Sequence, residues 1–439
     1  MSVDVVIIGA GAAGLTALSE LDQRGVKVVC VEARERIGGR IFTIRDPLCP
    51  LPVELGAEFI HGRPPEIWNF LKAAGLSAYD CCEKAVRLRD GKVQDKNDPW
   101  DLVDRILTDM ERAATRKDRT FAEFLAGRSY PENAKKLAIS YVEGFNAARQ
   151  DIIGIASLAK DERAADAIDG DRSFRNLAGY DSLMHVIVRG VDDLPHKLKL
   201  NSIVERIEWR AGAAAVHFCS AATRHKQSVH CRCVVITVPL GVLQASSDAP
   251  GAIAFDPEPG EILAAARKLQ FGEVVRLILR FRKPFWERNE KLADAGFFFS
   301  DEHFFPTWWT PLPIRAPILT GWSAGPHTDG LAGEPQLAII QRAVESLSRI
   351  TGTSAQQIEN LLGAAYYHDW QADPFSRGAY SYVPAGALPA RAVLARPVAG
   401  TLFFAGEATE QNGHSATVHG AIASGRRAAR QVLARFHTE

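Results

Sequence analysis

Hydrophobic positions at the start of the chain form two short runs separated by a helical stretch. Residues 3–8 are nearly continuous and rich in Val and Ile, which is typical of a central parallel strand buried on both faces. Leu15, Leu18 and Leu21 follow on one side of a predicted helix, and residues 26–31 form a second buried run. The pattern predicts a β-strand, a helix and a second parallel strand.

The rest of the chain changes from helical to strand periodicity and back. Residues 64–177 have mainly helical spacing and are rich in charge, as expected of a helical insertion. Further strands are predicted at 198–209, 213–220 and 233–239, at 276–281, and as an antiparallel sheet at 297–300, 307–310 and 318–322. A last strand around Phe404 precedes a helix that begins at Thr417.

Length, charge and apolar runs exclude several classes of protein. With 439 residues, 46% of them hydrophobic, the chain is long enough for two domains. Lys+Arg and Asp+Glu both number 52, so no basic surplus favours nucleic acid or an anionic membrane. No apolar run reaches the ~18–20 residues of a membrane span, and a buried strand from residue 3 leaves no room for a signal peptide. We therefore expect a cytoplasmic protein, monomer or homodimer.

Seven cysteines, an odd number in a large chain, make a disulfide framework unlikely to be the basis of the fold. Cys231 and Cys233 could be read as metal ligands, but they lie in the run 231–238, which has the pattern of a strand. No second Cys/His pair stands at zinc-ligand spacing. We interpret these residues as structural thiols and predict no metal.

The turn after the first strand carries the pattern GxGxxG, in the run Gly9 to Gly14 that includes Ala13. Gly9 allows a tight turn, Gly11 lets the backbone approach a pyrophosphate, and Gly14 lets the helix pack on the strand. Glu32 ends the second strand, where its carboxylate could accept hydrogen bonds from ribose hydroxyls. An ordinary glycine turn is the alternative, but strand, helix, strand and acid together favour dinucleotide binding.

The next segment indicates FAD rather than NAD. Ala33 precedes Arg34, and Arg40 follows the pair Gly38-Gly39. The two arginines bring positive charge toward a pyrophosphate, and the glycines let the backbone pass close to a ligand. NAD enzymes do not need this second clamp.

These motifs resemble those of the flavin-containing amine oxidases, a family that includes monoamine oxidases, polyamine oxidases and histone-lysine demethylases. The resemblance covers nearly the whole chain and is closest to the polyamine oxidase branch. It implies an α/β fold with a discontinuous, Rossmann-like FAD-binding domain and a substrate domain of mixed or antiparallel sheet flanked by helices. The FAD domain would span 1–63, 178–246 and 395–439, and the substrate domain 64–177 and 247–394.

The resemblance also assigns roles around the flavin. Gly56, Ala57 and Glu58 would run under the flavin, and the Val204 backbone would contact the adenine. Gly406 and Glu407 would hold the ribityl chain, the latter by accepting hydrogen bonds from its hydroxyls. The helix that starts at Thr417 and Val418 would direct its amides at the pyrimidine end and stabilise reduced flavin.

Other positions bear on the substrate. His61 would lie near it and could orient it or titrate near neutrality, with a hydrogen-bonded loop histidine as the alternative. Phe59 replaces an arginine common in amino-acid oxidases, which disfavours an amino-acid substrate. Tyr380 would form one aromatic wall beside the flavin, with Trp370 near the flavin edge.

Three departures from the family pattern affect the chemistry. Arg276 stands where most members have a lysine that holds a water against the flavin; it could hold a water or oxygen species, or simply pair with a carboxylate. Ala379 stands where monoamine oxidases have the cysteine that carries covalent flavin, so FAD should be non-covalent. His414 and Thr417 leave the usual aromatic cage incomplete.

The implied reaction is oxidation of the C–N bond of a polyamine or monoamine. A hydride equivalent passes to flavin N5, the imine hydrolyses to an aldehyde, and dioxygen reoxidises the flavin to give hydrogen peroxide. The partners would be a small-molecule amine and O2. The alternative is a dehydrogenase or desaturase of the same fold that uses another electron acceptor.

Overall fold

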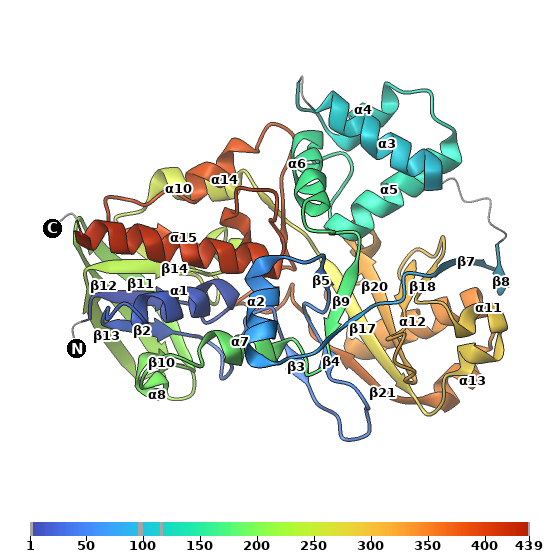
Figure 1. The fold of residues 1–439 in the computed structure, drawn as a ribbon, viewed down its shortest axis with the longest axis horizontal. Helices are drawn as coiled ribbons and strands as arrows, with labels where there is room; N and C mark the ends of the chain where they lie inside the picture. The colour runs from blue at the N-terminus through green and yellow to red at the C-terminus, as the bar shows by residue number, and fades with distance from the viewer. Residues whose placement is uncertain (1–2, 95–99, 115–116, 438–439) are drawn as a thin grey trace.

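The computed structural model describes residues 3–94, 100–114 and 117–437 of the chain (Figure 1). At its centre is a parallel sheet in the order β10-β2-β1-β14-β23. Its strands are β10 (Leu198–Lys199), β2 (Val28–Val31), β1 (Val5–Ile8), β14 (Cys233–Ile236) and β23 (Leu402–Phe404). Segments from the start, middle and end of the chain thus form one sheet, and the two ends of the sequence belong to a single α/β unit.

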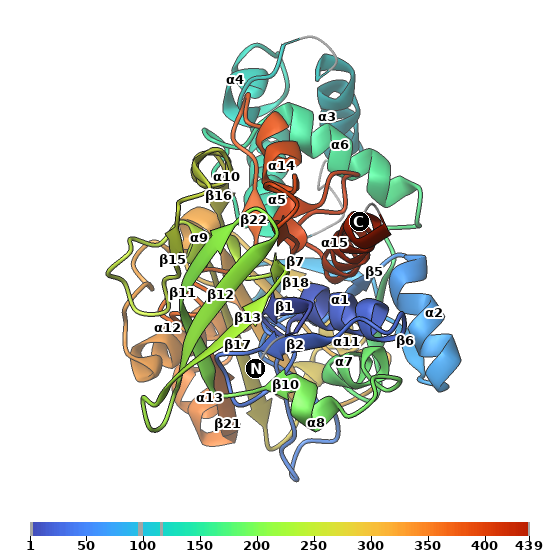
Figure 2. The ribbon, with the colours of Figure 1, turned by 90° about the vertical axis from the view of Figure 1, so that its left-hand side faces the viewer.

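Both faces of this sheet are covered, which explains its continuous Val and Ile runs. Helix α1 (Ala12–Asp22) and helix α15 (Val418–His437) lie side by side over one face, with α7 (Asp181–Ile187) beside them (Figures 1 and 2). A four-stranded sheet covers the other face. Its strands, in the order β13-β12-β11-β15, are Lys226–Cys231, Ala213–Ser220, Ser202–Arg210 and Ala254–Asp256.

The predicted strand at 198–209 is divided between these two sheets. Leu198 and Lys199 pair with β2, whereas β11 begins at Ser202 and pairs with β12. Asn201 separates them with a φ of 51°, a left-handed conformation that Asn adopts more readily than most residues. Alternation alone could not reveal this break, because it continues across the turn.

A seven-stranded, mostly antiparallel sheet forms the second half of the molecule, in the order β21-β17-β20-β19-β18-β7-β8. The predicted strands at 297–300, 307–310 and 318–322 are confirmed as antiparallel neighbours. The strands are Leu362–Tyr367, Val274–Phe281, Ile318–Ala324, Thr307–Trp309, Phe297–Phe299, Ala85–Arg89 and Lys92–Val93. Alternate side chains of β17 pack with helix α12 (Gln336–Thr351) in a hydrophobic core, which leaves Arg276 on the opposite face.

The helices predicted between residues 64 and 177 are present as α2 to α6. They are Pro65–Ala74, Trp100–Ala113, Phe121–Ala126, Glu132–Asn146 and Ile155–Asp166. The same span also supplies short strands that periodicity missed: β6 (Ala78–Asp80), β7, β8 and β9 (Ser173–Asn176). They pair with distant partners, so local sequence carries little of their signal. None of the helices within the described ranges is long and apolar enough to cross a membrane.

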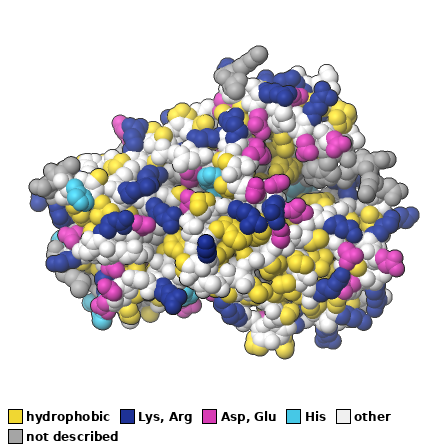
Figure 3. All heavy atoms as spheres, in the orientation of Figure 1, with side chains coloured by type: hydrophobic (Ala, Val, Ile, Leu, Met, Phe, Trp, Pro, Cys, Tyr) yellow, Lys and Arg dark blue, Asp and Glu magenta, His cyan; other side chains and the backbone are white. Residues whose placement is uncertain are grey.

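The shorter elements connect these layers. They are β3 (Thr43–Ile44), β4 (Val53–Glu54), β5 (Ile60–His61), α8 (Leu194–Lys197), α9 (Leu240–Leu243), α10 (Gly260–Arg267), β16 (Gln270–Phe271), α11 (Glu290–Ala293), α13 (Ala355–Leu361), β22 (Ser381–Tyr382) and α14 (Pro389–Leu394). Helices α3 to α6 stand above the rest of the molecule, and hydrophobic side chains gather beneath them on the face shown in Figure 3.

Candidate active site

One cavity of about 790 Å³ runs from the glycine-rich turn after β1 to the Arg276 face of the seven-stranded sheet. This volume lies in the upper part of the range for small-molecule and cofactor sites. It brings together every predicted site residue except Gly14. The residues that line it are Gly9, Gly11, Ala13, Glu32, Ala33, Arg34, Gly38, Gly39, Arg40, Gly56, Ala57, Glu58, His61, Val204, Arg276, Trp370, Tyr380, Gly406, Glu407, Thr417 and Val418.

The three motif glycines differ in what surrounds them. A Cβ on Gly14 would lie 1.9 Å from the carbonyl oxygen of Gly9, so the helix can approach the strand only without a side chain there. Gly9 has a φ of 98°, which favours glycine. A Cβ on Gly11, by contrast, would meet nothing in the protein nearer than 4.0 Å. Because Gly11 also lines the cavity, the space above its backbone suits a ligand that approaches closely, as a pyrophosphate does.

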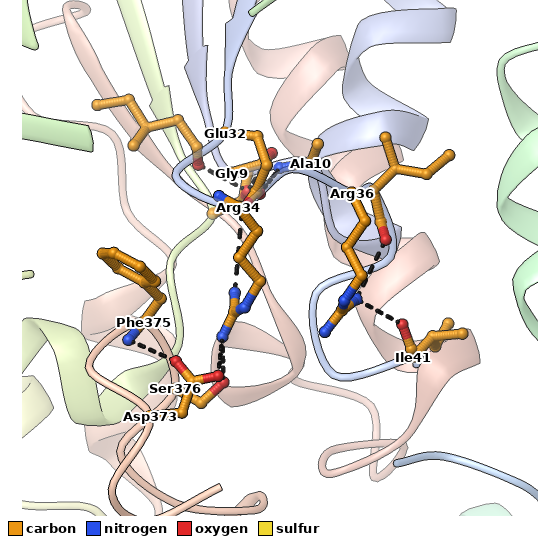
Figure 4. A network of polar contacts seen from close by, with 12 residues as sticks. Gly9, Ala10, Glu32, Arg34, Arg36, Ile41, Asp373, Phe375 and Ser376 are labelled. Carbon is orange, nitrogen blue, oxygen red and sulfur yellow. Dashed lines mark hydrogen bonds and ion pairs between the residues drawn. The ribbon is translucent and has the colours of Figure 1, made fainter. Parts of the chain in front are cut away.

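Glu32 is buried at the end of β2 and organises the same turn (Figure 4). One carboxylate oxygen accepts a hydrogen bond from the Ala10 backbone N–H at 2.7 Å, and the other accepts one from the Arg34 N–H at 2.9 Å. Each oxygen can accept a further bond. The carboxylate therefore fixes the turn and can still accept hydrogen bonds from a ligand in the cavity.

Arg34 is held by the segment after β21 (Figure 4). Its guanidinium donates to Asp373 at 2.8 Å and to the Ser376 hydroxyl at 2.9 Å. Burial alone would raise the pKa of Asp373, but hydrogen bonds from His368 and Arg34 outweigh it and lower that pKa to about 2. Asp373 is ionised at neutral pH, so it fixes Arg34 at the cavity wall and offsets part of the charge expected to face a pyrophosphate.

Arg40 and Glu407 form a second clamp farther along the cavity. Arg40 donates to Glu407 at 3.0 Å and to the Ala379 carbonyl at 2.7 Å. The other Glu407 oxygen accepts from the Ser381 hydroxyl at 2.6 Å and from the Ala416 N–H at 3.1 Å. Three distant segments thus meet on one buried carboxylate, which leaves it less free for ligand hydroxyls than the sequence suggests.

The predicted helix start at Thr417 is confirmed. The Thr417 hydroxyl accepts a hydrogen bond from the Gly420 N–H at 3.0 Å and donates to the His414 carbonyl at 2.6 Å. This is the geometry of an N-cap. Thr417 and Val418 line the cavity, so the N-terminal end of α15, with its partial positive charge, faces the cavity.

Arg276 is paired with a carboxylate, one of the two arrangements left open by the sequence. It donates to Glu58 at 2.6 Å and to the Gly56 carbonyl at 2.8 Å, and only 5% of its side chain is exposed. Glu58 also contacts Arg175 at 2.7 Å and accepts from the Trp309 indole at 2.9 Å. The carboxylate belongs to the segment predicted to run under the flavin, so the Arg276 guanidinium is anchored to that segment.

Aromatic side chains surround this network. Tyr380 donates its hydroxyl to the Phe145 carbonyl at 2.8 Å, and Trp370 donates its indole N–H to the Leu55 carbonyl at 2.9 Å. Both hydrogen bonds leave ring surface along the cavity, which both residues line. Trp309 and Trp322, with ring centroids 5.7 Å apart, form a further part of the wall.

His61 does not titrate near neutrality, contrary to one of its two predicted roles. Burial lowers the pKa of His61 to about 4, so its imidazole is neutral at pH 7. Its ring lies between Phe59 and Phe145, at centroid distances of 5.9 and 5.5 Å. Orientation of a substrate remains open to this side chain, whereas proton transfer at neutral pH is disfavoured.

A second histidine pair lies at the start of α15. The rings of His414 and His419 are 4.9 Å apart in an edge-to-face arrangement. Burial, together with His414 and His61, lowers the pKa of His419 to about 3. The His419 imidazole is therefore neutral at pH 7, and it packs against His414 where the aromatic cage was expected to be incomplete.

Several residues that line the cavity or pair with its lining were not predicted as site residues. Arg175, Ser381 and Asp373 belong to strands or loops far along the chain from their partners, so no local pattern identifies them. His419 follows directly after Thr417 and Val418 and could have been found as the next residue of the predicted helix end. The seven cysteines are free thiols, and the described residues contain no group of side chains suited to a metal ion.

Comparison with known proteins agrees with this geometry. A family model described as flavin containing amine oxidoreductase matches residues 12–433. Lysine-specific histone demethylase 1 homolog 3 from Arabidopsis thaliana is 27% identical over 98% of this chain, which covers 30% of that protein. Polyamine oxidase 2 from the same plant is 26% identical over 98% of this chain, which covers 87% of the relative. The chain spans only 30% to 57% of the first two demethylase relatives.

Solved structures share the fold. Putrescine oxidase bound to putrescine superposes with a TM-score of 0.82 at 20% identity, over 99% of both chains. Cyclohexylamine oxidase from Brevibacterium oxydans gives the same TM-score and coverage at 20% identity. The predicted α/β fold is thereby confirmed, and the family match extends from the glycine-rich turn to the last helix. The chain belongs to the flavin-containing amine oxidoreductases.

Proposed function

We propose that the chain binds FAD non-covalently and oxidises the C–N bond of a small amine. The observation that carries the proposal is the single cavity that joins a dinucleotide-binding turn to an aromatic chamber. The open space above Gly11 and the acceptor capacity of Glu32 fit an adenosine pyrophosphate at one end. Tyr380, Trp370 and the start of α15 fit an isoalloxazine and an amine at the other.

Bound flavin would supply the oxidising chemistry, as the acceptor of a hydride equivalent from the carbon beside the amine nitrogen. The product imine would hydrolyse to an aldehyde, and dioxygen would take up the electrons to give hydrogen peroxide. The protein's own groups bind and orient. The aromatic faces of Tyr380 and Trp370, which line the cavity, suit an amine. The partial positive charge of the α15 N-terminus suits negative charge that develops on the reduced cofactor.

Ala379 supports non-covalent binding. It lines the cavity and has no side-chain atom able to form a thioether. Acid precipitation of the purified protein should release all FAD into the supernatant. Yellow colour that stays in the pellet would contradict this part of the proposal.

The pairing of Arg276 supports a second candidate function, in which the electron acceptor is not dioxygen. Its pairing with Glu58 leaves it less free to hold a water or an oxygen species than an unpaired cation would be. A dehydrogenase or desaturase that passes electrons to another acceptor is therefore the alternative to an oxidase.

Anaerobic bleaching of the bound flavin tests the amine proposal. Spermine, spermidine, putrescine, aromatic monoamines and amino acids form the panel, and at least one polyamine or monoamine should bleach the visible absorption of the bound flavin. No bleaching by any amine would refute amine oxidation. Admission of air then distinguishes the acceptors, because an oxidase reoxidises rapidly and a dehydrogenase hardly at all.

A further inference from the structure

Three separate strands converge on the carboxylate of Glu58. Glu58 itself lies in the loop between β4 and β5, and its contacts come from Arg175 of β9, Arg276 of β17 and Trp309 of β19. Side-chain exposure is 12% for Glu58, 6% for Arg175 and 5% for Arg276. A buried carboxylate with three such partners is held in one position.

The charges of this group do not cancel. Burial alone would raise the pKa of Glu58, but Arg175 and Arg276 outweigh it and hold that pKa below its usual range. Glu58 is therefore an anion between two cations, and the three side chains carry a net charge of +1. Because they are buried, this charge is screened far less than a surface charge would be.

Arg276 and Glu58 both line the cavity, beside Gly56 and Ala57. Each Arg276 Nη nitrogen has an assigned acceptor, Gly56 for one and Glu58 for the other. The Trp309 ring lies 5.4 Å from the guanidinium carbon and restricts it further. Arg276 can therefore present its charge to the cavity in only one orientation, and Glu58 determines how much of that charge is balanced.

We propose that Glu58 is a positioning residue that fixes Arg276 and sets the positive charge acting on the bound flavin, and so tunes the cofactor's reduction potential. The inference rests on the proposed function. The role assigned to Glu58 acts through Arg276, because its oxygens contact Arg175, Arg276 and Trp309. A buried cation stabilises a reduced, more negative flavin, so each change of net charge should move the potential in a defined direction.

Single and double charge variants test this arrangement. Glu58→Gln raises the net charge of the group by one and should shift the midpoint potential of the bound flavin to more positive values. Arg276→Met lowers the net charge by one and should shift the potential to more negative values. For each, a tenfold change in the two-electron equilibrium is expected, which is about 30 mV. The double variant restores the original net charge and should return close to the unmodified protein.

A matched control lies on the same strand. Arg280 pairs with Asp46 at 2.9 Å on the same face of β17, and neither residue lines the cavity. Four residues of strand place it about 13 Å from Arg276. Asp46→Asn likewise removes a carboxylate that pairs with an arginine of β17, although Asp46 is only partly buried, and it should leave the potential unchanged.

Four readouts separate the outcomes. Potentials are measured at pH 8.5, above the pKa of about 7 to which burial raises neighbouring Glu54. The FAD dissociation constant, urea unfolding and the KM for the amine are measured for each variant. Equal potentials in all variants, or a raised KM in Glu58→Gln with no shift in potential, would overturn the inference. If Glu58→Gln fails to fold, an unshifted potential in Arg276→Met, equal to that of Asp46→Asn, still overturns the inference, because the charge that Glu58 is proposed to position would then not act on the flavin.

Failure of the proposed function is recognised independently. It would appear as a protein that binds no flavin, or as bound flavin that no amine reduces. Bound, amine-reducible flavin with unshifted potentials would instead refute only the role of Glu58.

Discussion

The two ends of the cavity are built in different ways. At the nucleotide end, the backbone and small residues of one contiguous segment, from β1 to Arg40, form most of the site. At the catalytic end, charged and aromatic side chains come from segments throughout the chain, as the contacts of Glu58 and Glu407 show. The first end is specified by local spacing and the second by tertiary folding.

This difference explains where each end tolerates change. The nucleotide end depends on close approach of main chain to main chain, where even one methyl group has no room at Gly14. The catalytic end depends on buried charges that are paired with one another. Loss of one partner leaves the other charge buried without its counter-charge, which is costly. Substitutions that affect only backbone packing, only cofactor binding or only a buried titratable group therefore test this comparison.

The largest effect is expected at Gly14. In Gly14→Ala, the new Cβ would lie 1.9 Å from the Gly9 carbonyl oxygen, so α1 must move away from β1. Because that contact is with backbone, we expect a loss of about 3 kcal/mol in the free energy of unfolding, at the upper end of overpacking costs. Urea denaturation of the flavin-free protein measures it. Stability equal to that of the unmodified protein would show that helix packing does not require this glycine.

Gly11 provides the matched comparison three residues earlier. A Cβ there meets no protein atom nearer than 4.0 Å but projects where the cavity begins. Gly11→Ala should therefore change the unfolding free energy of the flavin-free protein by less than about 0.5 kcal/mol. It should raise the FAD dissociation constant about tenfold, equal to about 1.4 kcal/mol.

Titration calorimetry of the flavin-free protein with FAD measures this second effect. Unchanged FAD affinity would mean that the cofactor does not approach this backbone. A large loss of stability would instead place Gly11 with Gly14 as a packing residue.

The same contrast sets what the sequence could predict. Gly9, Gly14 and Glu32 fall at fixed intervals within one βαβ unit, and the structure places them in the expected strand, turn and helix. Spacing succeeds there because the motif is a continuous piece of backbone. The α/β class, the last strand and the helix after Thr417 followed from similarly local patterns.

The partners of the catalytic end could not be found this way. Glu58 meets Arg175 and Arg276 across sequence separations of 117 and 218 residues, and nothing in the intervening chain encodes those meetings. The neutral state of His61 also depends on surrounding residues such as Phe145. Burial and long-range pairing are properties of the folded chain, so one sequence predicted the residues but not their charge states or partners.

The smallest expected effect concerns His61. Since the folded-state pKa of about 4 lies below the ordinary value of 6.5, the unfolded chain binds its proton first as the pH falls. His61 therefore contributes almost no pH dependence above about pH 7.5, and it weakens the fold as the pH falls through 6.5 to about 4. After allowance for its partial exposure, we expect about 1 kcal/mol of destabilisation from this residue between about pH 7.5 and 5.5.

His61→Gln tests whether this residue causes the acid destabilisation. It also tests whether His61 exchanges a proton during flavin reduction. Urea denaturation of the variant at the same two pH values should show about 1 kcal/mol less acid destabilisation than the unmodified protein. Because the imidazole is already neutral at pH 7, the neutral limb of the pH profile of flavin reduction should stay at the same pH even if the rate falls. A shift of that limb in His61→Gln would show that His61 does titrate during the reaction, and would make the catalytic end depend on proton exchange as well as on fixed charge.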